Sequence, residues 1–127
     1  MENIMHAFTW VEIPVTDFER AKKFYSKIFD FEMPQEQMGK DLMGFFQYDF
    51  ENGGVGGAIV KGEMYKPGNT GTMAYLDGGA DLNIVLNRIE DAGGKVQVPK
   101  TQITPEIGFF AIFSDTEGNR VALHSRK

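Results

Sequence analysis

Residues 44–59 read GFFQYDFENGGVGGAI and residues 108–123 read GFFAIFSDTEGNRVAL, at an offset of 108 − 44 = 64 positions. Each stretch has two strand-like halves around a polar turn that contains glycine, which is typical of a β-hairpin. Each also follows a short apolar strand and an amphipathic helix, so the order strand, helix, strands occurs once in each half of the chain. Two modules that cannot bury their own apolar faces are expected to pair and to enclose a cavity.

The elements before each hairpin follow from periodicity and capping residues. Residues 8–15 alternate between apolar and polar as in a strand, and a capping box of Thr16 and Glu19 predicts the start of a helix. In the second half, residues 72–76 repeat the opening strand, and Asp81 is the predicted N-cap of the second helix. The two halves therefore share one plan.

The chain of 127 residues has the size of one compact domain with a genuine core. We expect an α+β domain in which the first module covers about residues 5–62, a linker covers about residues 63–71, and the second module covers about residues 72–126. Glycine and proline are frequent in the linker, as expected of a segment between two modules.

Composition excludes several classes of function. There is no cysteine, so disulfides, thiolate metal sites and a cysteine nucleophile are excluded together. The formal charge is −5, and the scattered Lys and Arg residues form no basic patch, so no nucleic-acid partner is expected. No apolar run approaches the ~20 residues of a membrane span, and residues 1–3 lack the basic start of a secretory signal, so we expect a cytoplasmic protein without a membrane partner.

Several short motifs together resemble those of the vicinal oxygen chelate superfamily. They are Val15-Thr16-Asp17 followed by Ala21, Phe24-Tyr25 and Phe29, then Gly93-Gly94-Lys95-Val96, and finally Asp115-Thr116-Glu117-Gly118-Asn119-Arg120. That superfamily includes glyoxalase I, bleomycin-resistance proteins, fosfomycin-resistance enzymes and extradiol dioxygenases. The resemblance covers essentially the whole chain. It implies two βαβββ modules that form a half-open β-barrel with flanking helices, usually within a homodimer.

The same resemblance implies where a metal site would lie. In metal-using members, four inward-facing side chains, two from each module, hold one divalent ion. The corresponding positions here are Trp10, Ala58, Ala122, and either Thr72 or Ala74. A divalent ion of this type needs three or four N or O donors at about 2.0–2.2 Å, and none of these positions supplies an imidazole or a carboxylate. We therefore expect no metal and no other cofactor.

Two ionisable residues remain as candidates for chemistry in the cavity. Glu12 shares a strand face with Trp10, where a carboxylate beside an indole could act as a base or could instead pair with Arg120 or solvent. His124 faces inward by alternation with Ala122 and could transfer a proton or form a hydrogen-bonded wall. Glu12 and His124 could also form a weak two-ligand metal site. His6 has no partner at metal spacing and is expected on the surface.

Three functions remain open. The leading hypothesis is a metal-free member that binds a small organic molecule in an aromatic-lined cavity. Its predicted ligand-binding residues are Trp10, Glu12, Ala58, Val60, Thr72, Ala74, Arg120, Ala122 and His124. The second hypothesis is a glyoxalase-like isomerase or lyase that uses Glu12 or His124 for proton transfer. The third is a regulatory or interaction module that has lost the site. The sequence does not name the ligand.

Overall fold

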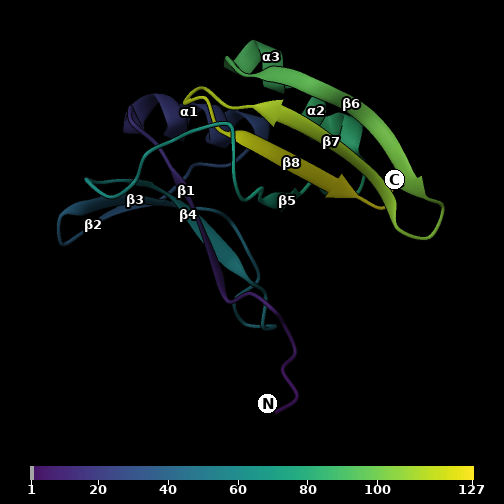
Figure 1. The fold of residues 1–127 in the computed structure, drawn as a ribbon, viewed down its shortest axis with the longest axis horizontal. Coiled ribbons are helices and arrows are strands. Elements are labelled where there is room, and N and C mark those ends of the chain that lie inside the picture. Colours follow the sequence, from purple (N-terminus) through teal and green to yellow (C-terminus); the bar gives the residue numbers. More distant parts are fainter. Residues whose placement is uncertain (1) are drawn as a thin grey trace.

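The computed structural model describes residues 2–127 and shows one strand-helix-strands module in each half of the chain (Figure 1). The first module consists of β1 (Trp10–Pro14), α1 (Phe18–Ile28), β2 (Gln35–Met38), β3 (Asp41–Phe45) and β4 (Gly56–Lys61). The second consists of β5 (Tyr75–Asp77), α2 (Leu82–Leu86), α3 (Ile89–Ala92), β6 (Lys95–Thr104), β7 (Gly108–Ser114) and β8 (Arg120–Ser125). The expected pair of βαβββ modules is confirmed, with the second helix divided in two.

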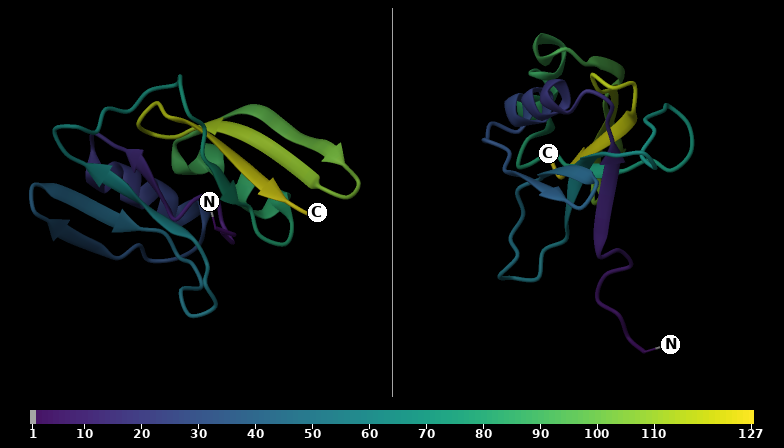
Figure 2. Two further views of the ribbon diagram at one scale, coloured as in Figure 1. Left: turned by 60° about the horizontal axis from the view of Figure 1, so that its bottom comes forward. Right: turned by 90° about the vertical axis from the view of Figure 1, so that its left-hand side faces the viewer.

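The two modules build two four-stranded sheets of the same topology, β1-β4-β3-β2 and β5-β8-β7-β6. In each sheet the first strand of the module pairs in parallel with the last, and the remaining pairs are antiparallel. The registers differ by one residue from the 64-residue offset, because Glu12 lies opposite Ala58 whereas Tyr75, and not Leu76, lies opposite Ala122. The sheets stay separate, with β1 and β5 as edge strands, so the barrel is half-open as expected (Figure 2).

One core lies between the helices and the sheet faces that are turned toward them. Its buried side chains come from both modules and include Ile13, Ala21, Phe24, Tyr25, Ile28, Ile59, Leu82, Ile89, Ala111, Phe113 and Leu123. Helix α1 contacts α3 of the second module, so the helices form a layer shared by both sheets (Figure 1). The opposite face of each sheet, called here its inner face, points away from the helices. No helix within residues 2–127 has the length and apolar character that a membrane crossing requires.

Two local features were not predicted correctly, the N-terminal cap of α1 and strand β2. The predicted capping box is wrong: the N-cap of α1 is Asp17, whose carboxylate accepts from the Arg20 amide at 3.1 Å. The Thr16 amide instead donates to Glu117, which lies on the other module. Strand β2 escaped prediction because all its side chains are exposed, so burial imposes no alternation on them.

The turn between β7 and β8, residues Asp115–Asn119, fastens the second module to the first. The Glu117 carboxylate accepts from the amides of Thr16 at 3.0 Å and Asp17 at 2.7 Å, and from Arg20 Nε at 2.7 Å. The Glu117 side chain is inaccessible to solvent; burial opposes its ionisation, but these donors outweigh burial and lower the pKa of Glu117. The contacts therefore favour a charged Glu117 in the folded protein.

Two further residues of this turn hold the first module. The Tyr25 hydroxyl donates to Asp115 Oδ2 at 2.7 Å, and Asn119 Nδ2 donates to the Pro14 carbonyl at 2.7 Å. Burial, together with the charge of Asp115, raises the pKa of Tyr25 well above its usual value, so its hydroxyl remains a donor. We call this set of contacts by the β7–β8 turn the turn clamp.

The turn clamp predicts the effect of removing a single hydroxyl. Tyr25→Phe should lower the free energy of unfolding by about 1–3 kcal/mol, because a buried hydrogen bond to a charged acceptor is lost. Urea denaturation measures this change. The matched control is Tyr75→Phe, at a ring that is 55% exposed, which should change the stability little. Equal stability of Tyr25→Phe and the unmodified protein would show that the Asp115 contact contributes nothing.

Candidate functional site

The inner face of the first module carries the predicted ligand-binding residues of that half. Ala58 and Val60 on β4 are fully buried and form an apolar floor together with Met43. Tyr65, from the segment after β4, packs on this floor. The linker therefore covers part of the face that the sequence predicted to be open cavity wall.

Glu12 lies beside this floor with both carboxylate oxygens engaged. Oε1 accepts from the Tyr65 hydroxyl at 2.6 Å, and Oε2 accepts from Trp10 Nε1 at 3.2 Å. The hydrogen bond to Glu12 is the main reason that the pKa of Tyr65 rises to about 12, so the phenol stays protonated at neutral pH. Glu12 takes part in neither of the two ion pairs found within residues 2–127, so the suggested partnership with Arg120 is wrong.

Aromatic rings border the carboxylate. The Trp10 ring centroid lies 6.2 Å from that of Phe45 and 6.3 Å from that of Tyr48, at interplanar angles of 57° and 76°. Tyr48 lies against Gly56, where an added Cβ would stand 2.3 Å from the ring. Trp10 is 36% and Tyr48 is 37% exposed, so ring faces remain open to solvent. We call Trp10, Glu12, Phe45, Tyr48 and Tyr65 the Trp10 corner.

The predicted residues of the second module lie on the other sheet. Ala122 is fully buried in β8 opposite Tyr75, and Arg120 is exposed at the start of the same strand. His124 Nε2 lies 2.7 Å from the Ile107 carbonyl oxygen, which supports its interpretation as a hydrogen-bonded wall residue. Glu12 and His124 thus stand on different sheets, and no hydrogen bond joins them in the described part of the chain.

The side chains at the positions implied for a metal site do not supply suitable ligands for a divalent ion. Trp10 Nε1 is a hydrogen-bond donor to Glu12, and Ala58 and Ala122 present only methyl groups. Thr72 is exposed and lies before β5, and Ala74 accepts the Ala122 amide through its backbone oxygen at 2.9 Å. Within residues 2–127, no three His, Asp or Glu side chains are grouped so as to hold an ion. The residues present therefore do not fit the metal site of metal-using relatives.

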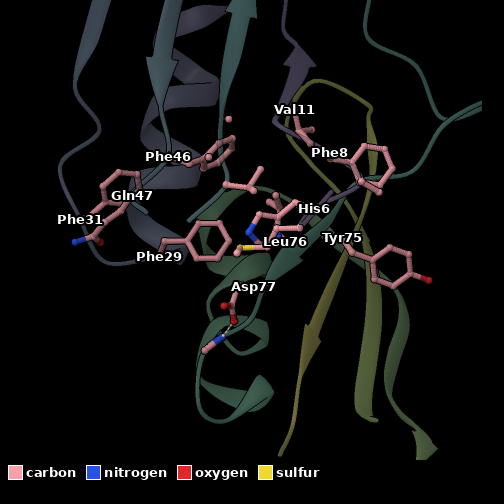
Figure 3. Close-up of a pocket in the computed structure, with 16 residues that line it drawn as sticks. His6, Phe8, Val11, Phe29, Phe31, Phe46, Gln47, Tyr75, Leu76 and Asp77 are labelled. Carbon is pink, nitrogen blue, oxygen red and sulfur yellow. Dashed lines mark hydrogen bonds between the residues drawn. The ribbon is translucent and has the colours of Figure 1, made fainter. Parts of the chain in front are cut away.

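Two hollows lie away from the Trp10 corner. One, of about 730 Å³, opens at the junction of the two modules and is lined by His6, Phe8, Val11, Phe29, Phe46 and Leu76 among others (Figure 3). None of the predicted ligand-binding residues lines it; His6 is exposed, as expected, and also lines this hollow. The other, of about 740 Å³, runs along β5 and the end of β8 and includes His124. The two hollows share Tyr75, Leu76, Asp77 and Gly79, so they adjoin along β5, whereas the Trp10 corner contributes no residue to either.

Sequence reasoning missed Tyr48 and Tyr65. Both lie outside the strands, in the segments before and after β4, where alternation carries no information about direction. Gly56 was a signal for Tyr48 alone, because a glycine inside a strand marks a close approach by another group.

Comparison with known proteins gives a consistent result. Residues 7–123 match the model of the Glyoxalase/Bleomycin resistance protein/Dioxygenase superfamily. A glyoxylase-like domain-containing protein from Didymella fabae is 30% identical over 119 residues, which cover 91% of each chain.

Solved structures share the fold. A glyoxalase/bleomycin resistance protein from Albidiferax ferrireducens T118 superposes with a TM-score of 0.69 and 16% identity over 96% of this chain and 100% of that one. TnmS3, an antibiotic binding protein from Streptomyces sp. CB03234, gives a TM-score of 0.63 and 22% identity over 99% and 100%. Glyoxalase I from Zea mays gives 0.65 and 17% over 93% of this chain, which spans only 44% of that enzyme.

The match of one family model to most of the chain agrees with the paired βαβββ modules and with the relative from Didymella fabae. The chain belongs to the Glyoxalase/Bleomycin resistance protein/Dioxygenase superfamily.

Proposed function

We propose that this chain is a metal-independent binding protein for a small organic molecule and that the ligand binds at the Trp10 corner. The supporting observation is the Glu12 carboxylate, held by Trp10 and Tyr65 beside half-exposed rings at the place implied for a metal ligand. Such a surface recognises a ligand by stacking and charge rather than by coordination.

The chemistry of the Trp10 corner favours a flat ligand that is neutral or cationic. Stacking on an aromatic ring contributes about 0.5–1.5 kcal/mol beyond area burial, and a cation over Trp or Tyr gains a similar amount. Glu12 has no Lys or Arg partner within residues 2–127, so its negative charge is available to a cationic ligand. The formal charge of −5 acts in the same direction and disfavours anions.

The similarity to TnmS3, an antibiotic binding protein, supports a binding function. The alternative, a glyoxalase-like lyase or isomerase, needs a group that stabilises an oxyanion, and the Trp10 corner presents a carboxylate there. The third alternative, a module without a ligand site, predicts that Trp10 responds to no small molecule. We therefore retain the binding function as the proposal.

We further propose that the chain forms a homodimer. Strand β6 and the turn after it leave apolar side chains in solvent, among them Ile103, which is 41% exposed, and Ile107, which is 50% exposed. Light scattering after gel filtration should therefore give twice the chain mass of 14.2 kDa. A mass of one chain at all protein concentrations would contradict the dimer. It would leave the ligand proposal unchanged.

The amount of metal bound by the protein can be measured directly. After incubation with zinc, nickel or manganese and removal of free ions, elemental analysis should find far less than one ion per chain, because Trp10, Ala58 and Ala122 supply no suitable donor. The stability of the protein should also be unchanged by a chelator. Stoichiometric retention of any of the three metals would overturn this proposal.

Ligand binding can be followed through Trp10, because it is the only tryptophan. Titration with a panel of neutral and cationic aromatic molecules should give a saturable change in its fluorescence. Glu12→Gln should weaken a cationic ligand about tenfold, because it removes the charge but keeps the shape. The matched control is Glu106→Gln in the exposed turn after β6, which should have less than about a twofold effect.

The outcomes of this titration separate the three functions. If the fluorescence of Trp10 in the folded protein changes with no molecule of the panel, this would contradict a binding site at the Trp10 corner and favour the module without a site. A measured turnover that Glu12→Gln abolishes at unchanged stability and ligand affinity would instead favour the enzyme.

A further inference from the structure

We propose that the hollow at the junction of the modules is a second, independent binding site for a flat, uncharged hydrophobic molecule. This junction pocket lies between residues 5–8, the segment after α1, the start of β4, and β5, and it has a volume of about 730 Å³ (Figure 3). That volume lies within the range of roughly 300–1,000 Å³ typical of small-molecule sites.

Aromatic rings form one wall of the junction pocket. Phe46 stands edge-on to Phe29 with centroids 6.3 Å apart and edge-on to Tyr25 at 5.3 Å. Tyr25 is fully buried and bonded to Asp115, so this wall rests on the turn clamp. Figure 3 shows Phe29 and Phe46 gathered with Leu76 around the hollow. A wall that is already packed in the absence of a ligand loses little entropy when a ligand binds.

The opposite wall comes from the two edge strands. Val11 on β1 and Leu76 on β5 line the hollow, and Gly56 and Gly57 contribute backbone without side chains. Only glycine fits at position 57, because the Cβ of any other residue would stand 2.4 Å from the Val11 carbonyl oxygen. The hollow is therefore a consequence of two sheets that approach without pairing.

The charge of the lining selects the ligand class. Asp77 and His6 are the ionisable side chains of the lining besides the Tyr75 phenol, and neither Lys nor Arg lines it. Asp77 Oδ1 already accepts from the Gly79 amide at 2.9 Å. An anionic ligand would lose its hydration beside a carboxylate with no cation to compensate, so an anion is disfavoured. Most of the lining is apolar, and Asp77 is already engaged by the Gly79 amide, so we expect an uncharged molecule.

The N-terminal segment borders the junction pocket without filling it. Met5 is 89% exposed and Phe8 is 71% exposed, so their side chains lie largely in solvent at the rim. The site shares no side chain with the Trp10 corner, since Trp10, Glu12, Phe45, Tyr48 and Tyr65 are all absent from the lining. Binding at the junction pocket can therefore be tested independently of the function proposed above.

The test uses two dyes of nearly the same shape on the whole chain. N-phenyl-1-naphthylamine is flat and uncharged, and 8-anilinonaphthalene-1-sulfonate adds one sulfonate to the same skeleton. We expect saturable fluorescence enhancement at one uncharged dye per chain, with at least about tenfold weaker binding of the sulfonate. Equal affinity for the two dyes, or no saturable binding of the uncharged dye, would overturn the proposal.

A matched pair of variants tests the location. Val55→Asp places a carboxylate in the lining, just before β4, and should weaken the uncharged dye about tenfold. Ile84→Asp makes the same kind of change at a side chain that is 52% exposed on α2, away from the hollow, and should leave the dye affinity within about twofold. An equal effect of the two variants would overturn the assignment.

Methyl NMR shifts locate the dye directly. The uncharged dye should shift the methyl signals of Val11 and Leu76, which line the junction pocket, and leave those of Val60, under the Trp10 corner, unchanged. Shifts at Val60 alone would overturn the second site while supporting binding at the Trp10 corner. Loss of dye binding as the protein concentration rises would show a second copy as the occupant and would also overturn it.

Discussion

The structure depends on the hydrogen bonds by which the β7–β8 turn of the second module holds the first module. Glu117 and Asn119 hold the backbone where β1 ends and α1 begins, and Asp115 holds Tyr25 in the core. The grip is one-sided: the 64-residue offset places Gly53 and Val55 opposite Glu117 and Asn119, and neither can form these hydrogen bonds. The duplicated halves are therefore alike in topology and unlike in what joins them.

Because only the β7–β8 turn forms these hydrogen bonds, the two ends of the junction between the modules differ. Asn119 holds the Pro14 carbonyl at the end of β1, whereas the junction pocket opens beside Val11, near the start of the same strand. The sheets are thus fastened at one end of their shared boundary and hollow at the other. Val55, the counterpart of Asn119 in the repeat, lines that hollow. The difference between the two turns accounts for both features together.

The strand-helix-strands plan of each half could be predicted because it follows from periodicity, whereas the half-open barrel was an expectation from the family resemblance. The α1 stripe and the 64-residue repeat are properties of local pattern, and burial enforces both. The site was predicted in part: Trp10 and Glu12 do lie together, but Tyr65 and the junction pocket depend on segments without regular structure. Glu117 takes the Thr16 amide from 101 residues away, so the capping box failed although its pattern was present.

At the Trp10 corner, the first sheet is coupled to the linker through Glu12. Each oxygen of Glu12 accepts one hydrogen bond, one from Trp10 and one from Tyr65, and these two contacts fix the orientation of the carboxylate. Tyr65 in turn packs on the floor of Met43, Ala58 and Val60, where larger polar ligands would displace its ring. An apolar floor and a docked linker therefore depend on each other. Installing a metal site here would need several substitutions at once, because carboxylates at positions 58 and 122 would be buried before any ion compensated their charge.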